Sequence, residues 1–285
     1  MNTFPGGALS CSPRRCWARQ GGFEFFWRNL PTAKARPAEP SQKKRLVLET
    51  AGRQTHPQMP SARSLLEEFL SHRTPGERYA SFDYCYNYFH SFPEPSCIAN
   101  AANLERSCMT LGFYLASWGM LRPRGQLLQR SARRLVEVIH VIASRESAPL
   151  WEIDAHSYSN QTAVRYLCQG YDSIAASLAL GASKKLVVAT KIMLGVFACV
   201  PAFDSRFSES MKWWCWHRHK FESFDPDAIA VLARFYSRHR RLIDCESRSI
   251  HTFAFNTGRD TVRTYTRAKI MDMIGFQARG REIRP

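Results

Sequence analysis

From residue 61 onward, apolar side chains recur every three or four residues, and this period restricts the fold more than any other feature. In the segment 61–71 it gathers Leu65, Leu66 and Phe69 on one side. A 3.6-residue period is typical of amphipathic helices. The same period marks four further segments, at about residues 103–120, 126–143, 161–180 and 264–280. Because no run alternates apolar and polar residues clearly, the sequence predicts a single all-α domain over residues 61–283.

Residues 1–60 differ from this pattern. They hold ten Lys or Arg residues and three Asp or Glu residues, with scattered Pro and Gly and no apolar period. Such composition is typical of disordered segments, so we predict a disordered basic tail before the helical domain. A translation start at Met59, which would exclude this tail from the natural protein, is an equally good interpretation.

Nine cysteines occur without any C-x-x-C spacing, mostly within apolar helical stretches. This usage favours reduced, buried thiols and a cytosolic setting over a disulfide-linked secreted protein. No apolar run reaches the ~18 residues that a membrane-spanning helix needs, so no membrane partner is expected.

A formal net charge of +16 favours anionic partners, above all DNA or RNA. Arg122 and Arg124 lie in a predicted turn, and Arg130 follows on the polar side of the next helix, so these three are candidate phosphate contacts. A solvated basic face, or a surface for an acidic protein, explains the same charge. The sequence contains no motif for a nucleotide cofactor, and none is expected.

The segment "WWCWHRHK" combines Cys215, His217 and His219, which are zinc-ligand types. No second cluster has matching spacing, so we expect no metal site and interpret the tryptophans as packing on the core. His239 lies among arginines and is expected on an exposed basic face.

The stretch "LGASKKLVVATKIMLGVFACVPAFDSRF", residues 180–207, leaves two interpretations of one carboxylate. In the first, Ser183 caps a helix and Asp204 caps the next one, which is a common role for both residue types. In the second, Asp204 faces a lysine across a catalytic site.

The second interpretation rests on a resemblance of residues 178–210 to helix-hairpin-helix DNA glycosylases. The resemblance implies that "GASKK" stands at the hairpin, that Lys185 is the nucleophile and that Asp204 is the catalytic aspartate. It also implies that the hairpin, with Ser183 and Lys184, contacts a DNA phosphate, and Lys191 is a further candidate phosphate contact. A lysine of this kind attacks the sugar carbon while a carboxylate stabilises the sugar cation.

Four other motifs, "FDYCYNYF", "LGFYLASWGMLR", "TKIMLGVFACVPAFD" and "YTRAKIMDMIGF", resemble a conserved bacterial protein family of unknown function. This resemblance covers most of residues 78–280. It implies a bacterial, cytoplasmic protein and brings no activity with it.

Overall fold

The computed structural model describes residues 60–121, 127, 129–178, 180, 182–279 and 283, with the backbone alone for 182–184. Apart from Pro60, the predicted tail lies outside these residues, and so does the predicted turn at 121–125 except for Leu121. The α-helices of the described part are α1 (Ala62–Ser71), α2 (Ser81–Phe89), α3 (Ala101–Ser117), α4 (Val136–Ile142), α5 (Gln161–Ser177), α6 (Ala182–Phe197), α7 (Ser205–Trp214), α8 (Pro226–Ser249) and α9 (Arg267–Ala278).

The predicted all-α class is confirmed, with one small addition that the sequence did not indicate. Strands β1 (His251–Phe253) and β2 (Asp260–Thr264) form an antiparallel hairpin after α8. Five short 3₁₀ turns connect the described helices: η2 (Arg78–Ala80), η3 (Pro95–Ala99), η4 (Ala132–Leu135), η5 (Arg145–Trp151) and η6 (Ala155–Ser157). No helix among the described residues is long and apolar enough to cross a membrane.

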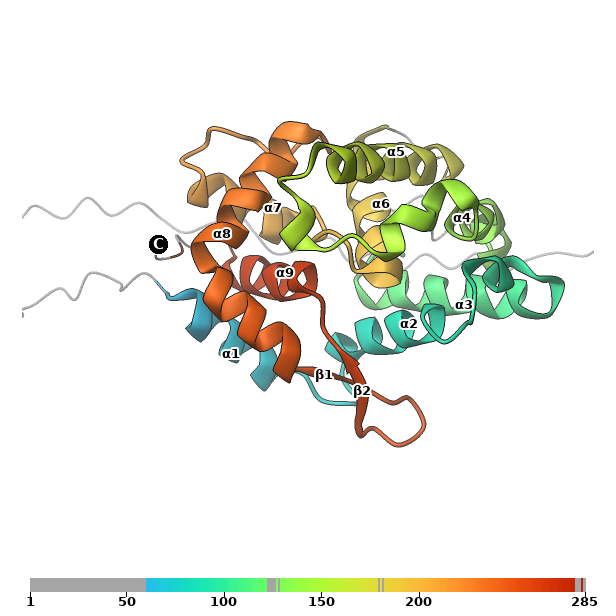
Figure 1. Cartoon of the computed structure of the whole chain (residues 1–285). Helices are drawn as coiled ribbons and strands as arrows, with labels where there is room; N and C mark the ends of the chain where they lie inside the picture. The colour runs from blue at the N-terminus through green and yellow to red at the C-terminus, as the bar shows by residue number, and fades with distance from the viewer. Residues whose placement is uncertain are drawn as a thin grey trace, which may run out of the picture. The chain divides into compact units, whose positions relative to one another are not determined.

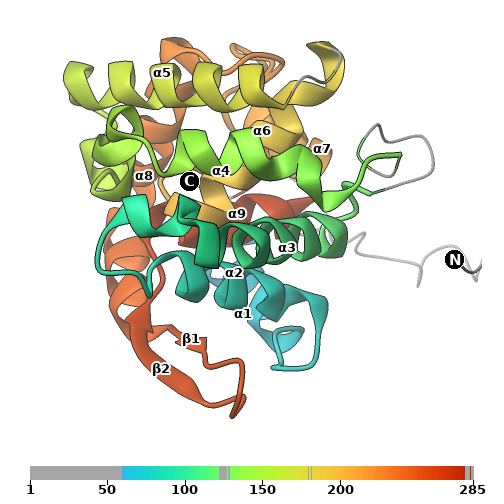
Figure 2. The same ribbon diagram turned by 90° about the vertical axis from the view of Figure 1, so that its right-hand side faces the viewer.

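Helix α9 forms the centre of the helical domain. Every residue from Ala268 to Ala278 is buried, which is typical of a helix enclosed on all sides. Helices α1, α7 and α8 pack against it, and Figure 1 shows α9 between α1 and α7. Figure 2 shows α5 along the side of the domain opposite α1, with α2 and α3 between them.

Helices α3 and α6 approach each other closely at a glycine. A Cβ atom built on Gly195 would lie 2.3 Å from Cε1 of Tyr114, which is a distance that real Cβ atoms do not adopt. The Tyr114 ring is 1% exposed and fills this space. The sequence therefore permits the α3–α6 contact by omitting a side chain at position 195.

Side-chain caps mark the starts of three helices, among them the cap expected from Asp204. The side chains of Ser61, Asp204 and Asp225 each accept hydrogen bonds from backbone N–H groups of the helix that follows. Two boundaries were wrong. Helical structure near the predicted segment 126–143 begins only at Ala132, and α6 begins at Ala182, so Ser183 lies inside its first turn rather than at its cap.

Candidate functional site

The carboxylate of Asp204 both caps a helix and faces a lysine. Its Oδ1 accepts from the N–H groups of Arg206 (3.1 Å) and Phe207 (3.0 Å), which open α7. Its Oδ2 accepts from Nζ of Lys191 at 2.8 Å. Asp204 therefore caps α7 and also faces a lysine, but that lysine is Lys191 of α6 rather than Lys185.

The lysine of this pair lies in the protein interior. Lys191 is 3% exposed, and its ammonium lies 4.9 Å from the ring centre of Trp118. An ammonium in this position is stabilised by the carboxylate and by the aromatic ring together. This placement leaves almost none of its surface exposed for contact with a phosphate.

A second buried pair lies on α9. Nζ of Lys269 donates to Oδ2 of Asp272 at 2.9 Å, and the other oxygen of Asp272 accepts from the N–H of Ala202 at 3.1 Å. The N–H of the next residue, Phe203, donates to Oγ1 of Thr190 at 2.9 Å. Segment 200–204 is thus attached to α6 and α9 by its backbone, and both ion pairs support the connection between α6 and α7.

Of the remaining predicted site residues, the structure describes the side chains of Lys185 and Arg130 alone, and neither pairs with Asp204. Lys185 is half-buried and makes no hydrogen bond or ion pair with Asp204 among the described contacts. Ser183 and Lys184 lie in the first turn of α6, and their side chains are outside the described atoms. Arg130 is exposed beside α3, while Arg122 and Arg124 are outside the described residues.

A different surface, at the end of α7, combines aromatic and basic side chains. Trp213 is 44% exposed and Trp216 is 75% exposed. The expectation that this tryptophan cluster packs on the core is wrong for these two residues. It holds for their neighbour Trp214, whose ring centre lies 5.1 Å from that of Phe235.

The backbone that presents Trp216 is strained. The N–H of Trp216 donates to the carbonyl of Trp213 (3.1 Å), and the N–H of His217 donates to the carbonyl of Lys212 (2.8 Å). These are the two hydrogen bonds of a Schellman helix end, in which glycine normally takes the left-handed position. Here Trp216 takes it with φ of 55°, a conformation that costs an L residue about 1–2 kcal/mol.

Arginines of α8 lie beside this turn. A pocket of about 500 Å³ is lined by Trp214, Trp216, Arg218, Arg234 and Arg238, among others. The three arginines are exposed, and none of them forms an ion pair within the part of the chain that the structure describes. We call the exposed side chains of Trp216, Arg218, Arg234 and Arg238, which share the lining of this pocket, the Trp–Arg face.

His239 borders the Trp–Arg face but does not share its exposure. It interrupts α8 with φ of −107° and ψ of 15°, and its Nε2 is buried with no hydrogen-bond partner among the described residues. Burial, assisted by the charge of Arg238, lowers the pKa of His239 to about 4. The expectation of an exposed basic histidine at this position is therefore wrong, although Arg238, Arg240 and Arg241 around it are exposed.

Within the triplet of Cys215, His217 and His219, the first and last side chains are engaged with other groups of the protein. The thiol of Cys215 lies 3.6 Å from the carbonyl oxygen of His219. The ring of His219 accepts from the N–H of Phe221 through Nδ1 and pairs with Asp225 through Nε2 at 3.3 Å. No group of three His, Cys, Asp or Glu side chains in the described residues is arranged to hold a metal ion.

Comparison with other proteins does not add to these observations. No protein-family model, curated protein or solved structure matches the chain. The functional argument therefore depends on the geometry of the two clusters, one enclosed between α6, α7 and α9, and the other exposed on the Trp–Arg face.

Proposed function

We propose that this protein binds single-stranded nucleic acid through the Trp–Arg face. The observation that carries the proposal is Trp216, a large aromatic side chain held in solvent by a backbone conformation that glycine would adopt at lower cost. Burial of the indole ring does not offset this strain, because Trp216 is 75% exposed. Strain of this kind is typical of functional positions.

The chemistry of the face fits a single strand. An exposed indole ring offers a platform on which a nucleobase stacks, and such stacking contributes about 1–3 kcal/mol per base. Guanidinium groups bind phosphate oxygens with paired hydrogen bonds. Arg234 and Arg238 lie one turn apart on α8, so a backbone that follows this helix meets both while a base contacts Trp216.

The experiment measures binding of a fluorescently labelled 12-nucleotide single strand by anisotropy, across a series of salt concentrations. Trp216→Gly weakens binding about 10-fold or more, since a stacked base loses its partner. Arg234→Gln combined with Arg238→Gln lowers the slope of log K against log salt by about 1.4, because two phosphate contacts are lost.

A matched control separates this face from the general charge of the protein. Arg145→Gln removes one exposed arginine of η5, outside the Trp–Arg face, and leaves the affinity within about twofold. Equal affinity of the wild-type protein and the Trp216→Gly variant for the oligonucleotide would refute the proposal.

Base excision is a separate proposal that the glycosylase resemblance carries alone. It needs Lys185 and Asp204 at one site, and the described contacts of Asp204 are all with other residues. Borohydride trapping on a duplex with an abasic site tests it: an adduct that disappears in Lys185→Ala would establish the chemistry, and no adduct is expected from the observed pairing.

The setting that we propose is the bacterial cytoplasm. The described cysteines, at positions 85, 97, 108, 168, 199, 215 and 245, are all free thiols. Free thiols support a reducing compartment. A bacterial origin rests on the four motifs that resemble a bacterial family.

A further inference from the structure

Helix α3 exposes a row of apolar and small residues. Met109, Gly112, Phe113 and Ala116 follow at intervals of three and four residues and so share one side of the helix. Met109 is 57% exposed and Phe113 is 70% exposed. A helix that packs on a core with its other side normally carries polar residues here, so this row is an apolar surface without a partner in the described structure.

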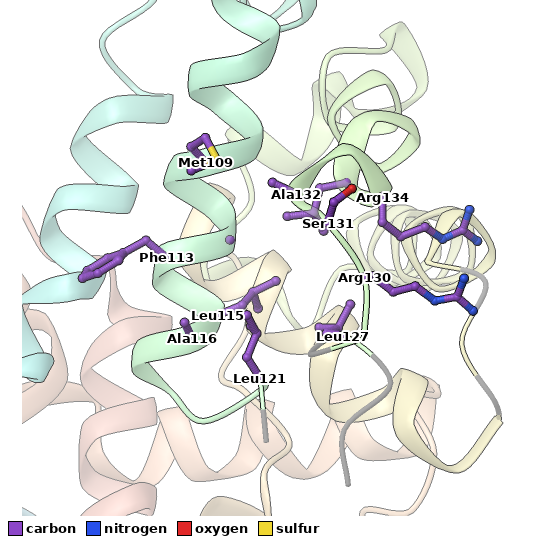
Figure 3. Close-up of a pocket in the computed structure, with 12 residues that line it drawn as sticks. Met109, Phe113, Leu115, Ala116, Leu121, Leu127, Arg130, Ser131, Ala132 and Arg134 are labelled. Atoms are coloured by element: carbon purple, nitrogen blue, oxygen red, sulfur yellow. The ribbon is translucent and has the colours of Figure 1, made fainter. Parts of the chain in front are cut away.

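A pocket lies alongside this row. It has a volume of about 250 Å³, and its apolar lining includes Leu115, Leu121, Leu127 and Leu135. Figure 3 shows that α3 forms one wall and that Leu127, Ser131 and Ala132 lie across from it. A concave apolar site of this kind accepts a side chain of leucine or phenylalanine size.

Two arginines occupy the edge of this pocket away from α3, and a third lies around a recess beside it. Arg130 and Arg134 contribute to its lining, and Figure 3 shows their side chains next to each other, extending away from α3. Arg133 joins them around an adjacent recess, where Glu137 is the acidic residue. No ion pair in the described part of the chain involves any of the three arginines.

We propose that this groove binds an acidic amphipathic helix of a partner protein. Apolar side chains of that helix would cover Met109 and Phe113 and enter the pocket, and its carboxylates would pair with the arginines at the edge. An apolar centre rich in Met and Phe with an arginine border is the composition of protein interfaces. A helix suits the site better than a membrane does, because the pocket is concave and the arginines lie on one side only.

The experiment uses a labelled synthetic 15-residue peptide with leucines at helical spacing and glutamates on both sides of the leucine row. The control peptide has the same composition in scrambled order. We expect the helical peptide to bind at least about 10-fold more tightly than the scrambled peptide, as a good hot-spot contact contributes. Phe113→Ser, an exposed position whose change leaves the core intact, should abolish this difference.

Charge reversal tests the arginine edge independently. The variant with Arg130→Glu and Arg134→Glu should lose the acidic peptide and bind a version in which lysines replace the glutamates. Trp216→Gly should bind the acidic peptide as the wild-type protein does, so this site and the proposed nucleic-acid site can fail separately.

Three results would overturn the proposal. The first is equal binding, or equal absence of binding, for the helical and scrambled peptides. The second is unchanged peptide binding in Phe113→Ser. The third is binding to phosphatidylserine vesicles that depends on Phe113 while the peptide does not bind, which would assign the groove to a membrane surface.

Discussion

Helices α6 and α7 both end on a left-handed residue that is not glycine, and the two ends differ in what surrounds that residue. After α6, Ala198 has φ of 51° and is fully buried. Its carbonyl accepts from Oγ1 of Thr266 at 2.7 Å, and the next carbonyl, of Cys199, accepts from the hydroxyl of Tyr158 at 2.8 Å. After α7, Trp216 has φ of 55° and is 75% exposed.

The fold requires the left-handed backbone at Ala198 but does not require the one at Trp216. Around Ala198, hydrogen bonds from distant parts of the chain fix the backbone, and the conformation brings segment 200–204 to α9. Around Trp216, the hydrogen bonds are those of the helix end itself. The left-handed conformation at Trp216 exposes its side chain. We therefore assign a functional role to the end of α7 and a structural role to the end of α6.

The largest predicted effect comes from removing the carboxylate of Asp204, which lies in the segment after the buried C-terminal end of α6. Asp204→Ala leaves the ammonium of Lys191 buried without its partner and also removes the cap of α7. We expect the free energy of unfolding to fall by about 3–5 kcal/mol, measured by urea denaturation.

The double variant Lys191→Met with Asp204→Asn tests the reason for this loss. Methionine fills a similar volume without charge, and asparagine retains the cap. The double variant should be more stable than Asp204→Ala by at least about 2 kcal/mol. Equal stability of the two would show that the unpaired charge is not the cause.

The second largest effect on stability is expected at Gly195, in the last turn of α6, where α6 contacts α3. Gly195→Ala places a methyl group into the Tyr114 ring, where neither helix can move freely. We expect a loss of about 1–3 kcal/mol in the free energy of unfolding, as for other overpacked cores. Adding Tyr114→Leu should recover part of this loss, and a variant Gly195→Ala as stable as the wild type would contradict the close packing.

Glycine substitutions compare the two left-handed residues directly. Trp216→Gly relieves the strain while giving up little burial, so the free energy of unfolding should rise by about 0.5–1 kcal/mol. Ala198→Gly relieves the same strain but loses a buried methyl group, so its net change should be smaller. Thermal denaturation of both variants ranks them, and a destabilised Trp216→Gly would show that the indole ring packs more than its exposure indicates.

Acid should lower the free energy of unfolding gradually, through His90 near the end of α6 and His239 near the end of α7. Burial lowers the pKa of His90, which contacts the carbonyl of Val196, and of His239, beside the Trp–Arg face, to about 4 from an ordinary value of 6.5. The unfolded chain therefore binds more protons between these values, and stability is lost as the pH falls from about 6.5 to 4. Denaturation at several pH values should show a shallower loss in His90→Gln and in His239→Gln.

Local chemistry explains which parts of this fold could be predicted from the sequence. The helices and the cap at Asp204 depend on neighbouring residues, and these were predicted. The hairpin was missed because its strands have only three and five residues. The pairing of Lys191 with Asp204 was missed because α6 is enclosed on several sides, so the period of its apolar residues does not reveal which lysine points inward.

The Trp–Arg face was missed for a different reason. Three tryptophans within residues 213–216 indicate a buried segment by composition alone. The left-handed turn at Trp216 and His217 directs the chain away from the core, and side chains other than glycine give no signal for such a turn. The arginines of α8 were visible in the sequence, but their position beside this turn depends on the tertiary structure.

The central claim is that the strain at Trp216 is retained for ligand binding. The most direct test measures, on the same preparation of Trp216→Gly, the free energy of unfolding and the affinity for the 12-nucleotide single strand at low salt. The account predicts that the variant is at least as stable as the wild-type protein and binds about 10-fold or more weakly. A variant that is less stable and binds with unchanged affinity would contradict it.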